Sequence, residues 1–117
     1  GRMKLKKQYS IVIIDSNKLK IRYLSSMINM LYQKAKLIGS ESTLESGIKL
    51  IESKKPDIVI LDMNLKDQKG KSFLERFNNL NFEVIINEDD DFYRLDYEKS
   101  VKAGYIMKKI DFFELFV

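Results

Sequence analysis

The sequence lacks cysteine and histidine entirely and contains one proline, Pro56. Without cysteine there are no disulfides and no thiolate chemistry. Without histidine the chain lacks the commonest general base, any Ser-His triad and most kinds of zinc site. No apolar run is long enough to span a membrane, and no signal-peptide pattern is present. We therefore expect a cytoplasmic protein with no membrane contact.

Charge is nearly balanced, with 21 lysines and arginines against 17 acidic residues, for a net charge of +4. A basic balance is compatible with nucleic-acid binding, and a basic nucleic-acid-binding domain stays open as an alternative. Lysines are spread along the chain, however, and the one dense cluster, residues 4–7, has no interleaved aromatic residues for base stacking. We therefore expect no direct nucleic-acid contact from this domain.

The chain is long enough for one domain with a sizeable core. Gly1-Arg2 before Met3 is typical of a cloning remnant, so residues 1–8 are expected to be a tag remnant and a basic lead. The domain itself is expected over 9–117.

Short apolar runs alternate with helical patterns through the rest of the chain. Strands are expected at 11–14, 36–39, 58–61, 82–86 and 105–107, with helices at 17–35, 40–55, 71–80, 97–104 and 110–117. Asn17 is the expected cap of the first helix, and Ser42 with Glu45 has the spacing of a capping box for the second. Such alternation predicts an α/β fold, a doubly wound five-stranded parallel sheet with helices on both faces.

Polar residues follow these strands directly. Asp15 and Ser16 follow the first strand, Asp62 the third, Asn87 and Glu88 the fourth, and Lys108 the fifth. In parallel α/β sheets the ligands bind at the carboxyl ends of the strands. We therefore expect Asp15, Asp62 and Lys108 to converge at one edge of the sheet.

At these residues the sequence resembles the receiver domain of bacterial response regulators. The resemblance covers about residues 9–117 and is strongest in "IGSESTLESGIKLIESKKPDIVILDMNLKDQKG". Asp62 matches the family's phospho-acceptor aspartate, Gly70 the glycine eight residues later, Asp15 the first acid of the pair, and Lys108 the lysine after the last strand, with Tyr105 three residues before it. The resemblance implies a flavodoxin-like fold with receiver topology.

The resemblance also implies a chemistry. A carboxylate attacks a phosphoryl group, Mg²⁺ neutralises the charge, and a lysine pairs with the phosphoryl oxygens. On this chain Asp62 would be the phospho-acceptor, Lys108 the phosphoryl partner and Asn87 the residue at the hydroxyl-switch position. The Mg²⁺ ligands would be Asp15, Asp62 and the backbone carbonyl of Asn64.

Four residues depart from the family pattern. Ser16 replaces the second acid, so it is a weak or lost metal ligand and we expect weak Mg²⁺ binding. Asn87 replaces the hydroxyl residue, Glu88 replaces a small residue beside Asp62, and Lys109 replaces a proline. A cis bond before a non-proline residue costs about 2.5–4 kcal/mol, so the Lys108-Lys109 bond is expected to be trans.

We therefore predict an atypical receiver domain of a two-component system, a non-enzymatic signalling module whose dependence on phosphate is reduced or absent. The alternative is a working receiver, a phosphoprotein modified on Asp62 by a histidine kinase with Mg²⁺. A histidine kinase and a homodimer stay open as partners, and an effector domain is expected C-terminal in the parent chain. The fifth helix is expected to be short or truncated. Two plain interpretations also stay open: Asp15 as a helix cap, and Asp62 as the ion-pair partner of Lys108.

Overall fold

The computed structural model of the protein describes residues 7–65, 73, 75, 76, 81–96 and 106–117. The predicted third helix falls mostly, and the predicted fourth helix entirely, outside these residues, as do Gly70 and Tyr105. No helix in the described ranges is long and apolar enough to cross a membrane.

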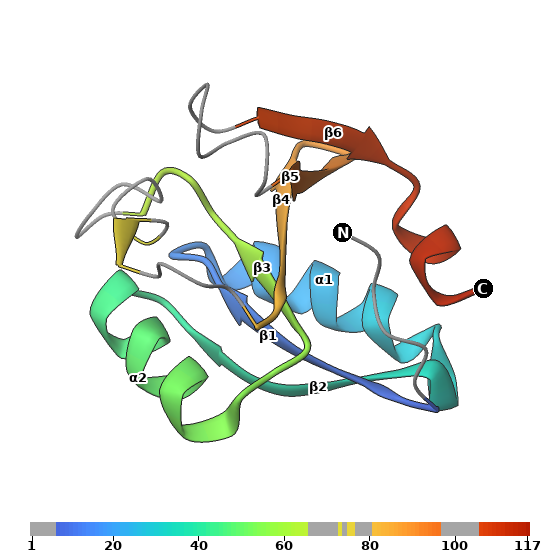
Figure 1. Ribbon diagram of the computed structural model, residues 1–117, viewed down its shortest axis with the longest axis horizontal. Helices are drawn as coiled ribbons and strands as arrows, with labels where there is room; N and C mark the ends of the chain where they lie inside the picture. Colours follow the sequence, from blue (N-terminus) through green and yellow to red (C-terminus); the bar gives the residue numbers. More distant parts are fainter. Residues whose placement is uncertain (1–6, 66–72, 74, 77–80, 97–105) are drawn as a thin grey trace.

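The described strands form one six-stranded sheet in the order β2-β1-β3-β4-β5-β6 (Figure 1). The strands are β1 Tyr9–Ile14, β2 Ala35–Glu41, β3 Ile58–Leu61, β4 Glu83–Glu88, β5 Asp91–Asp96 and β6 Ile106–Ile110. Neighbours among the first four pair in parallel, whereas β5 pairs antiparallel with both β4 and β6. The α/β fold with a mostly parallel sheet is confirmed, but the sheet has six strands where five were expected.

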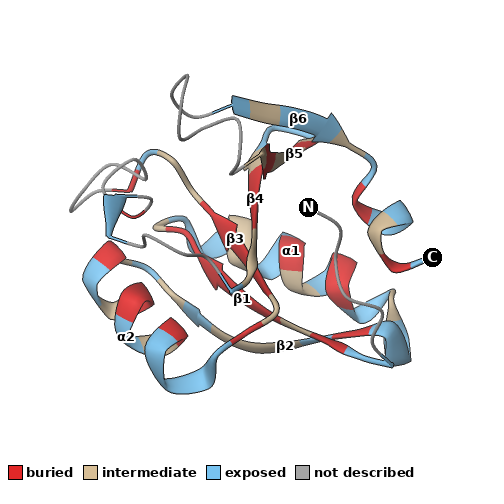
Figure 2. Ribbon diagram, in the orientation of Figure 1, coloured by how far each residue is buried: buried red, intermediate tan, exposed pale blue. Residues whose placement is uncertain are grey.

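Two apolar clusters cover the two faces of the sheet, because successive side chains in a strand point to opposite faces. Helix α1 Lys18–Asn29 packs Leu24, Met27 and Ile28 against one face. Helix α2 Leu44–Lys54 packs Ile48 and Ile51 against the other. Strands β1, β3 and β4 are the most deeply buried part of the molecule (Figure 2). Burial on both faces explains why these strands are continuous apolar runs.

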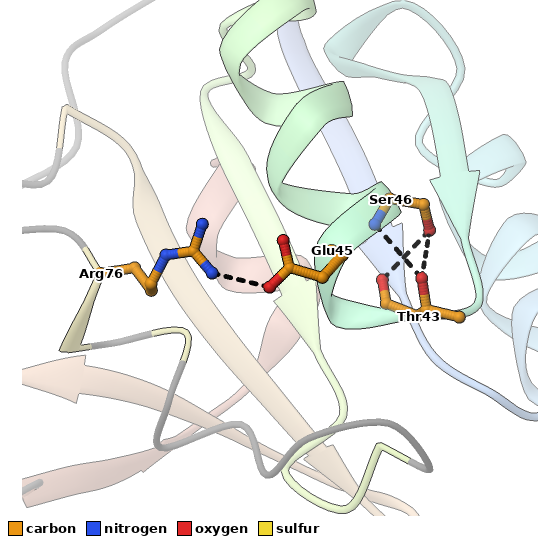
Figure 3. A network of polar contacts seen from close by, with 4 residues as sticks. All are labelled: Thr43, Glu45, Ser46 and Arg76. Atoms are coloured by element: carbon orange, nitrogen blue, oxygen red, sulfur yellow. Dashed lines mark hydrogen bonds and ion pairs between the residues drawn. The ribbon is translucent and has the colours of Figure 1, made fainter.

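The sequence pattern predicted the cap of α1 correctly but placed the cap of α2 one residue too early. Asn17 caps α1 as predicted, accepting hydrogen bonds from the backbone N–H groups of Leu19 and Lys20. The cap of α2 is Thr43, one residue after the predicted Ser42, and its hydroxyl accepts from the N–H of Ser46 at 3.2 Å (Figure 3). The predicted capping box is therefore wrong.

Glu45, the acid of that predicted capping box, lies at the start of α2 and forms an ion pair with Arg76. The pair is 2.7 Å long and joins α2 to a segment 31 residues further along the chain. Both side chains are about half exposed, so the pair adds little to stability.

Strand β5 was not predicted. The acidic run 87–91 contains a tight β4–β5 turn in which Glu88 pairs with Asp91. Asp89 has a φ of 53°, and two-residue hairpin loops favour such left-handed residues. The Arg94 guanidinium of β5 donates two hydrogen bonds to the Glu83 carboxylate of β4, at 2.9 and 2.7 Å.

The chain ends in a short 3-10 helix, η2 Phe112–Phe116, in place of the predicted fifth α-helix. Asp111 caps it by accepting from the N–H of Phe113. Phe112 packs against Phe92 of β5, with ring centroids 4.9 Å apart, and Phe116 packs edge-on against Tyr9. These aromatic contacts hold η2 on the α1 face of the sheet.

Candidate phospho-acceptor site

Asp15 is the one buried charged residue in the described part of the chain, with an exposed fraction of 7%. It directly follows β1, and its backbone N–H donates to the carbonyl of Glu41 at 3.0 Å. Its carboxylate accepts a hydrogen bond from the N–H of Asn17 at 2.8 Å. The carboxylate is thus held at the carboxyl end of β1, beside the start of α1.

Asp62 directly follows β3, the neighbour of β1. Its N–H donates to the carbonyl of Ile14 at 2.8 Å, which continues the β1–β3 pairing by one residue. One carboxylate oxygen accepts from the N–H of Asn64 at 2.9 Å. This register places Asp62 next to Asp15, so the structure brings the two predicted carboxylates together.

The two carboxyl groups influence each other electrostatically. Burial is the main reason why the pKa of Asp15 is raised above its ordinary value, and the negative charge of Asp62 and a hydrogen bond to it raise it further. The Asn17 N–H and the positive charge of Lys20 act in the opposite direction. Lys20 is therefore a cation of this site that the sequence pattern did not reveal.

This carboxylate pair has the chemistry of a magnesium site. Mg²⁺ is bound in proteins by one or two carboxylates together with waters and phosphate oxygens. Asp15 and Asp62 supply two carboxylates, and when bound the ion would neutralise charge between Asp62 and a phosphoryl group. Half-buried Ser16 stands where a third carboxylate would be. No group of three or more metal-binding side chains occurs in the described ranges.

Asn87, at the expected hydroxyl-switch position, is engaged in the β4–β5 turn. Its amide nitrogen donates to the backbone carbonyls of Asp91 at 2.9 Å and Asp89 at 3.2 Å. Its oxygen is buried and has no hydrogen-bond partner in the described part of the chain. A primary amide has only two donor hydrogens, so Asn87 keeps an acceptor but no spare donor.

Lys108 lies elsewhere than expected. It is exposed in the middle of β6, where it pairs with Arg94 of β5, and three strand-to-strand steps separate it from β3. At about 4.8 Å per step this is about 14 Å. The structure therefore does not bring Lys108 to Asp15 and Asp62, and strand β5 is the reason.

The remaining predicted residues are exposed: Lys109, Glu88 and Asn64. Lys109 forms an exposed 3.3 Å ion pair with Asp91, and the Lys108-Lys109 bond is trans as predicted. Glu88 is exposed as the last residue of β4, and Asn64 is exposed beside Asp62. The plain interpretation of Asp62 as an ion-pair partner of Lys108 is not supported by this geometry.

Comparison with known proteins places the chain in a family. The profile of the response regulator receiver domain matches residues 11–117. The transcriptional regulatory protein DegU of Brevibacillus brevis is 25% identical over 105 residues, covering 86% of this chain but 44% of DegU. The chain thus spans less than half of that relative.

Solved structures with low sequence identity share the fold. A LuxR-family DNA-binding response regulator from Staphylococcus aureus has a TM-score of 0.60 at 23% identity, covering 80% of this chain and 78% of that one. The receiver domain of the putative response regulator NarL from Mycobacterium tuberculosis has a TM-score of 0.56 at 19% identity, covering 72% of each chain. With the profile match over nearly its whole length, this chain belongs to the response regulator receiver domain family.

Proposed function

We propose that this receiver domain signals through protein contacts with reduced or absent dependence on phosphate. The hydrogen bonding of Asn87 carries the proposal. A phosphoryl group offers only acceptor oxygens, and both donor hydrogens of Asn87 are already used by the turn carbonyls. Phosphorylation of Asp62 would therefore gain no hydrogen bond from this residue unless the β4–β5 turn opened.

Two further features support the same proposal. Lys108, about 14 Å from β3 across the sheet, would not pair with phosphoryl oxygens on Asp62. Ser16 leaves two carboxylates for Mg²⁺, and weaker metal binding would leave more uncompensated negative charge around an incoming phosphoryl group. Attack by Asp62 would thus lack three sources of charge stabilisation.

A working receiver phosphorylated on Asp62 is the second candidate, and the Asp15–Asp62 pair favours it. The pair keeps the carboxylate chemistry that the family's phosphoryl transfer with Mg²⁺ requires. In that case a histidine kinase would supply the phosphoryl group. In either case we propose that an effector domain acts with this receiver in the parent protein, by analogy with DegU, a transcriptional regulatory protein.

The two candidates are separated by direct labelling. The protein is incubated with Mg²⁺ and acetyl phosphate or amidophosphate, and its intact mass is measured beside that of Asp62→Asn. We expect no more labelling of the unmodified chain than of Asp62→Asn. Near-complete labelling that Asp62→Asn abolishes would overturn the proposal in favour of a working receiver.

A second set of variants tests the reason for weak labelling. Ser16→Asp with Asn87→Thr restores an acid and a hydroxyl, and Glu88→Ala removes an exposed carboxylate near the strand end. We expect labelling to rise most in Ser16→Asp/Asn87→Thr and little in Glu88→Ala. Full labelling of Glu88→Ala alone would show that charge repulsion by Glu88, and not loss of donors and ligands, blocks Asp62.

A further inference from the structure

A pocket of about 370 Å³ lies between the first turns of helix α1 and the carboxyl end of strand β2. Pockets that hold small ligands have volumes of about 300–1,000 Å³, so this one has room for a small molecule and not only for an ion. Neither Asp15 nor Asp62 lines it, so it is distinct from the carboxylate site. The residues that line the pocket are Lys18, Ile21, Arg22, Ser40, Glu41 and Ser42.

Two cations, Lys18 and Arg22, form the α1 side of the pocket. They are four residues apart, so their side chains are neighbours on one face of the helix. Both residues are exposed, and neither forms an ion pair within the described part of the chain. Like charges at this spacing repel each other, and an anion bound between them would relieve that repulsion.

Two hydroxyls lie on the β2 side of the pocket. Ile38 is skipped in the β1–β2 register, which shifts the strand by one residue. As a result Ser40 pairs with Ile13, whose side chain packs in the cluster under α1, so Ser40 also faces α1. Ser42 follows two residues later and lines the same pocket. Among the residues that the structure describes, neither hydroxyl has a hydrogen-bond partner.

Glu41 is the one acid among the described residues that line the pocket. It pairs with Ile14, which packs in the cluster under α2, so the Glu41 side chain lies on the opposite face of the sheet from α1. Its backbone carbonyl accepts from the N–H of Asp15 at 3.0 Å. The charged side chains directed at the pocket are therefore the two cations of α1.

We propose that this pocket between α1 and β2 binds a small phosphomonoester. The ester carries a charge close to −2, which matches the two cations, and its phosphate oxygens accept hydrogen bonds. The Arg22 guanidinium, the Lys18 ammonium and the two serine hydroxyls are all able to donate to such oxygens. Half-buried Ile21 and the aliphatic stems of the two cations offer apolar contact to the carbon part of the ligand.

Binding at this pocket is non-covalent and needs neither Mg²⁺ nor Asp62, so the proposal stands or falls independently of the proposed function. The probes are glucose 6-phosphate and AMP, titrated without Mg²⁺ in the presence of EDTA. Amide resonances of the isotope-labelled chain report where each probe binds. We expect saturable shifts at residues 18–22 and 40–42 with at least one ester, and none with glucose or adenosine. Absence of saturable shifts at these residues with both esters at millimolar concentration would overturn the proposal.

Matched variants separate this pocket from other causes of anion binding. Lys18→Gln and Arg22→Gln should each raise the dissociation constant of the bound ester at least tenfold. The control is Lys49→Gln on α2, which removes the same charge from an exposed helical position that does not line the pocket. Asp62→Asn should leave the affinity unchanged. An equal loss in Lys49→Gln would mean unspecific charge attraction, and loss of binding in Asp62→Asn would place the ester at the carboxylate site; either result would overturn the proposal.

Discussion

The N-terminal and C-terminal halves of this receiver domain differ in how closely they follow the arrangement predicted from the sequence. From β1 to β3, residues 9–61, the strands pair in parallel as the sequence pattern predicts, β1 and β3 are buried, and Asp15 and Asp62 lie together at their carboxyl ends. From β4 onward, residues 83–117, an antiparallel strand is inserted, Asn87 is engaged in a turn and Lys108 is displaced. The half with the carboxylate pair thus keeps the predicted arrangement, and the half with Asn87 and Lys108 departs from it.

This difference indicates that the carboxylate pair and the arrangement of Asn87 and Lys108 are supported by separate interactions. The carboxylate pair depends on backbone hydrogen bonds between β1, β2 and β3. The geometry of Asn87 and Lys108 depends on the β4–β5 turn and on the Glu83–Arg94 ion pair. Variants in one half should therefore leave the properties of the other half largely unchanged.

The largest effect is expected from Gly47→Val in α2. A Cβ at this position would lie 2.6 Å from Cδ1 of Ile14 and 3.0 Å from its Cγ2, and Ile14 is fully buried. Overpacking of a core costs typically 1–3 kcal/mol, and valine adds two more methyl groups, so we expect a loss of about 3 kcal/mol. Chemical denaturation measures it.

Gly39→Val is the matched control for Gly47→Val. Its added Cβ would meet the terminal methyl groups of Leu50 at 3.0 and 3.2 Å, and these can move more easily than the branched Ile14. The loss of stability should therefore be clearly smaller. Equal losses at the two glycines would contradict the tight β1–α2 packing on which the position of Asp15 depends.

The same contrast explains how much could be predicted from the sequence. Continuous apolar runs such as Ile58–Leu61 identify buried parallel strands, and the residue after such a run is placed at the sheet edge by register alone. Strand β5 follows an acidic run without glycine that is typical of a loop, so its pairing was missed. The displacement of Lys108 and the use of the Asn87 donors both follow from that one strand, and neither has a local sequence signal.

The next effect in size is expected from Arg94→Gln, in the second half. Arg94 makes two charge-assisted hydrogen bonds to Glu83 in a partly buried position, and hydrogen bonds to charged groups contribute about 1.5–3 kcal/mol. Because both groups keep some solvent contact, we expect a loss of about 1.5 kcal/mol. Hydrogen exchange should show faster opening of β5 and β6, with β1 and β3 almost unchanged.

Lys109→Gln is the control for Arg94→Gln. Its ion pair with Asp91 is exposed, so its removal should cost less than about 0.5 kcal/mol. If Arg94→Gln instead accelerates exchange equally in β1 and β3, the two halves unfold as one unit and the proposed separation is wrong.

A tenfold effect on metal affinity, about 1.4 kcal/mol, is expected from Ser16→Asp. The added carboxylate would lie beside Asp15 and Asp62 and supply a third oxygen ligand for Mg²⁺. Calorimetry should show weak binding to the unmodified chain and about tenfold tighter binding to the variant. Ser26→Asp, on the exposed side of α1, is the control and should leave the affinity unchanged. Micromolar affinity in the unmodified chain would mean that the two carboxylates suffice.

The smallest effect is expected from Asp15→Asn. This substitution should increase the stability of the protein, and the sign of the change is what makes it informative. The pKa of Asp15 is raised chiefly by burial, so the folded state holds the proton more tightly than the unfolded state. Stability is then lost as the pH rises from the ordinary aspartate pKa through the raised one. Asparagine avoids this loss and can still accept from the N–H of Asn17. We expect a gain on the order of 1 kcal/mol at pH 7, in the range of ordinary single substitutions, that disappears at low pH.

Two comparisons make the Asp15→Asn result specific. Asp57→Asn should have the opposite sign, because the Asp57 carboxylate accepts hydrogen bonds from both the N–H and the hydroxyl of Ser10. Added Mg²⁺ should stabilise the unmodified chain more than Asp15→Asn, since a ligand of the folded state alone raises its stability by mass action. The gain from asparagine should therefore shrink as Mg²⁺ is added. If the gain in stability from Asp15→Asn is independent of both pH and Mg²⁺, the gain comes from packing. Repulsion within the carboxylate pair would then not destabilise the protein, and a bound cation would have no such repulsion to reduce.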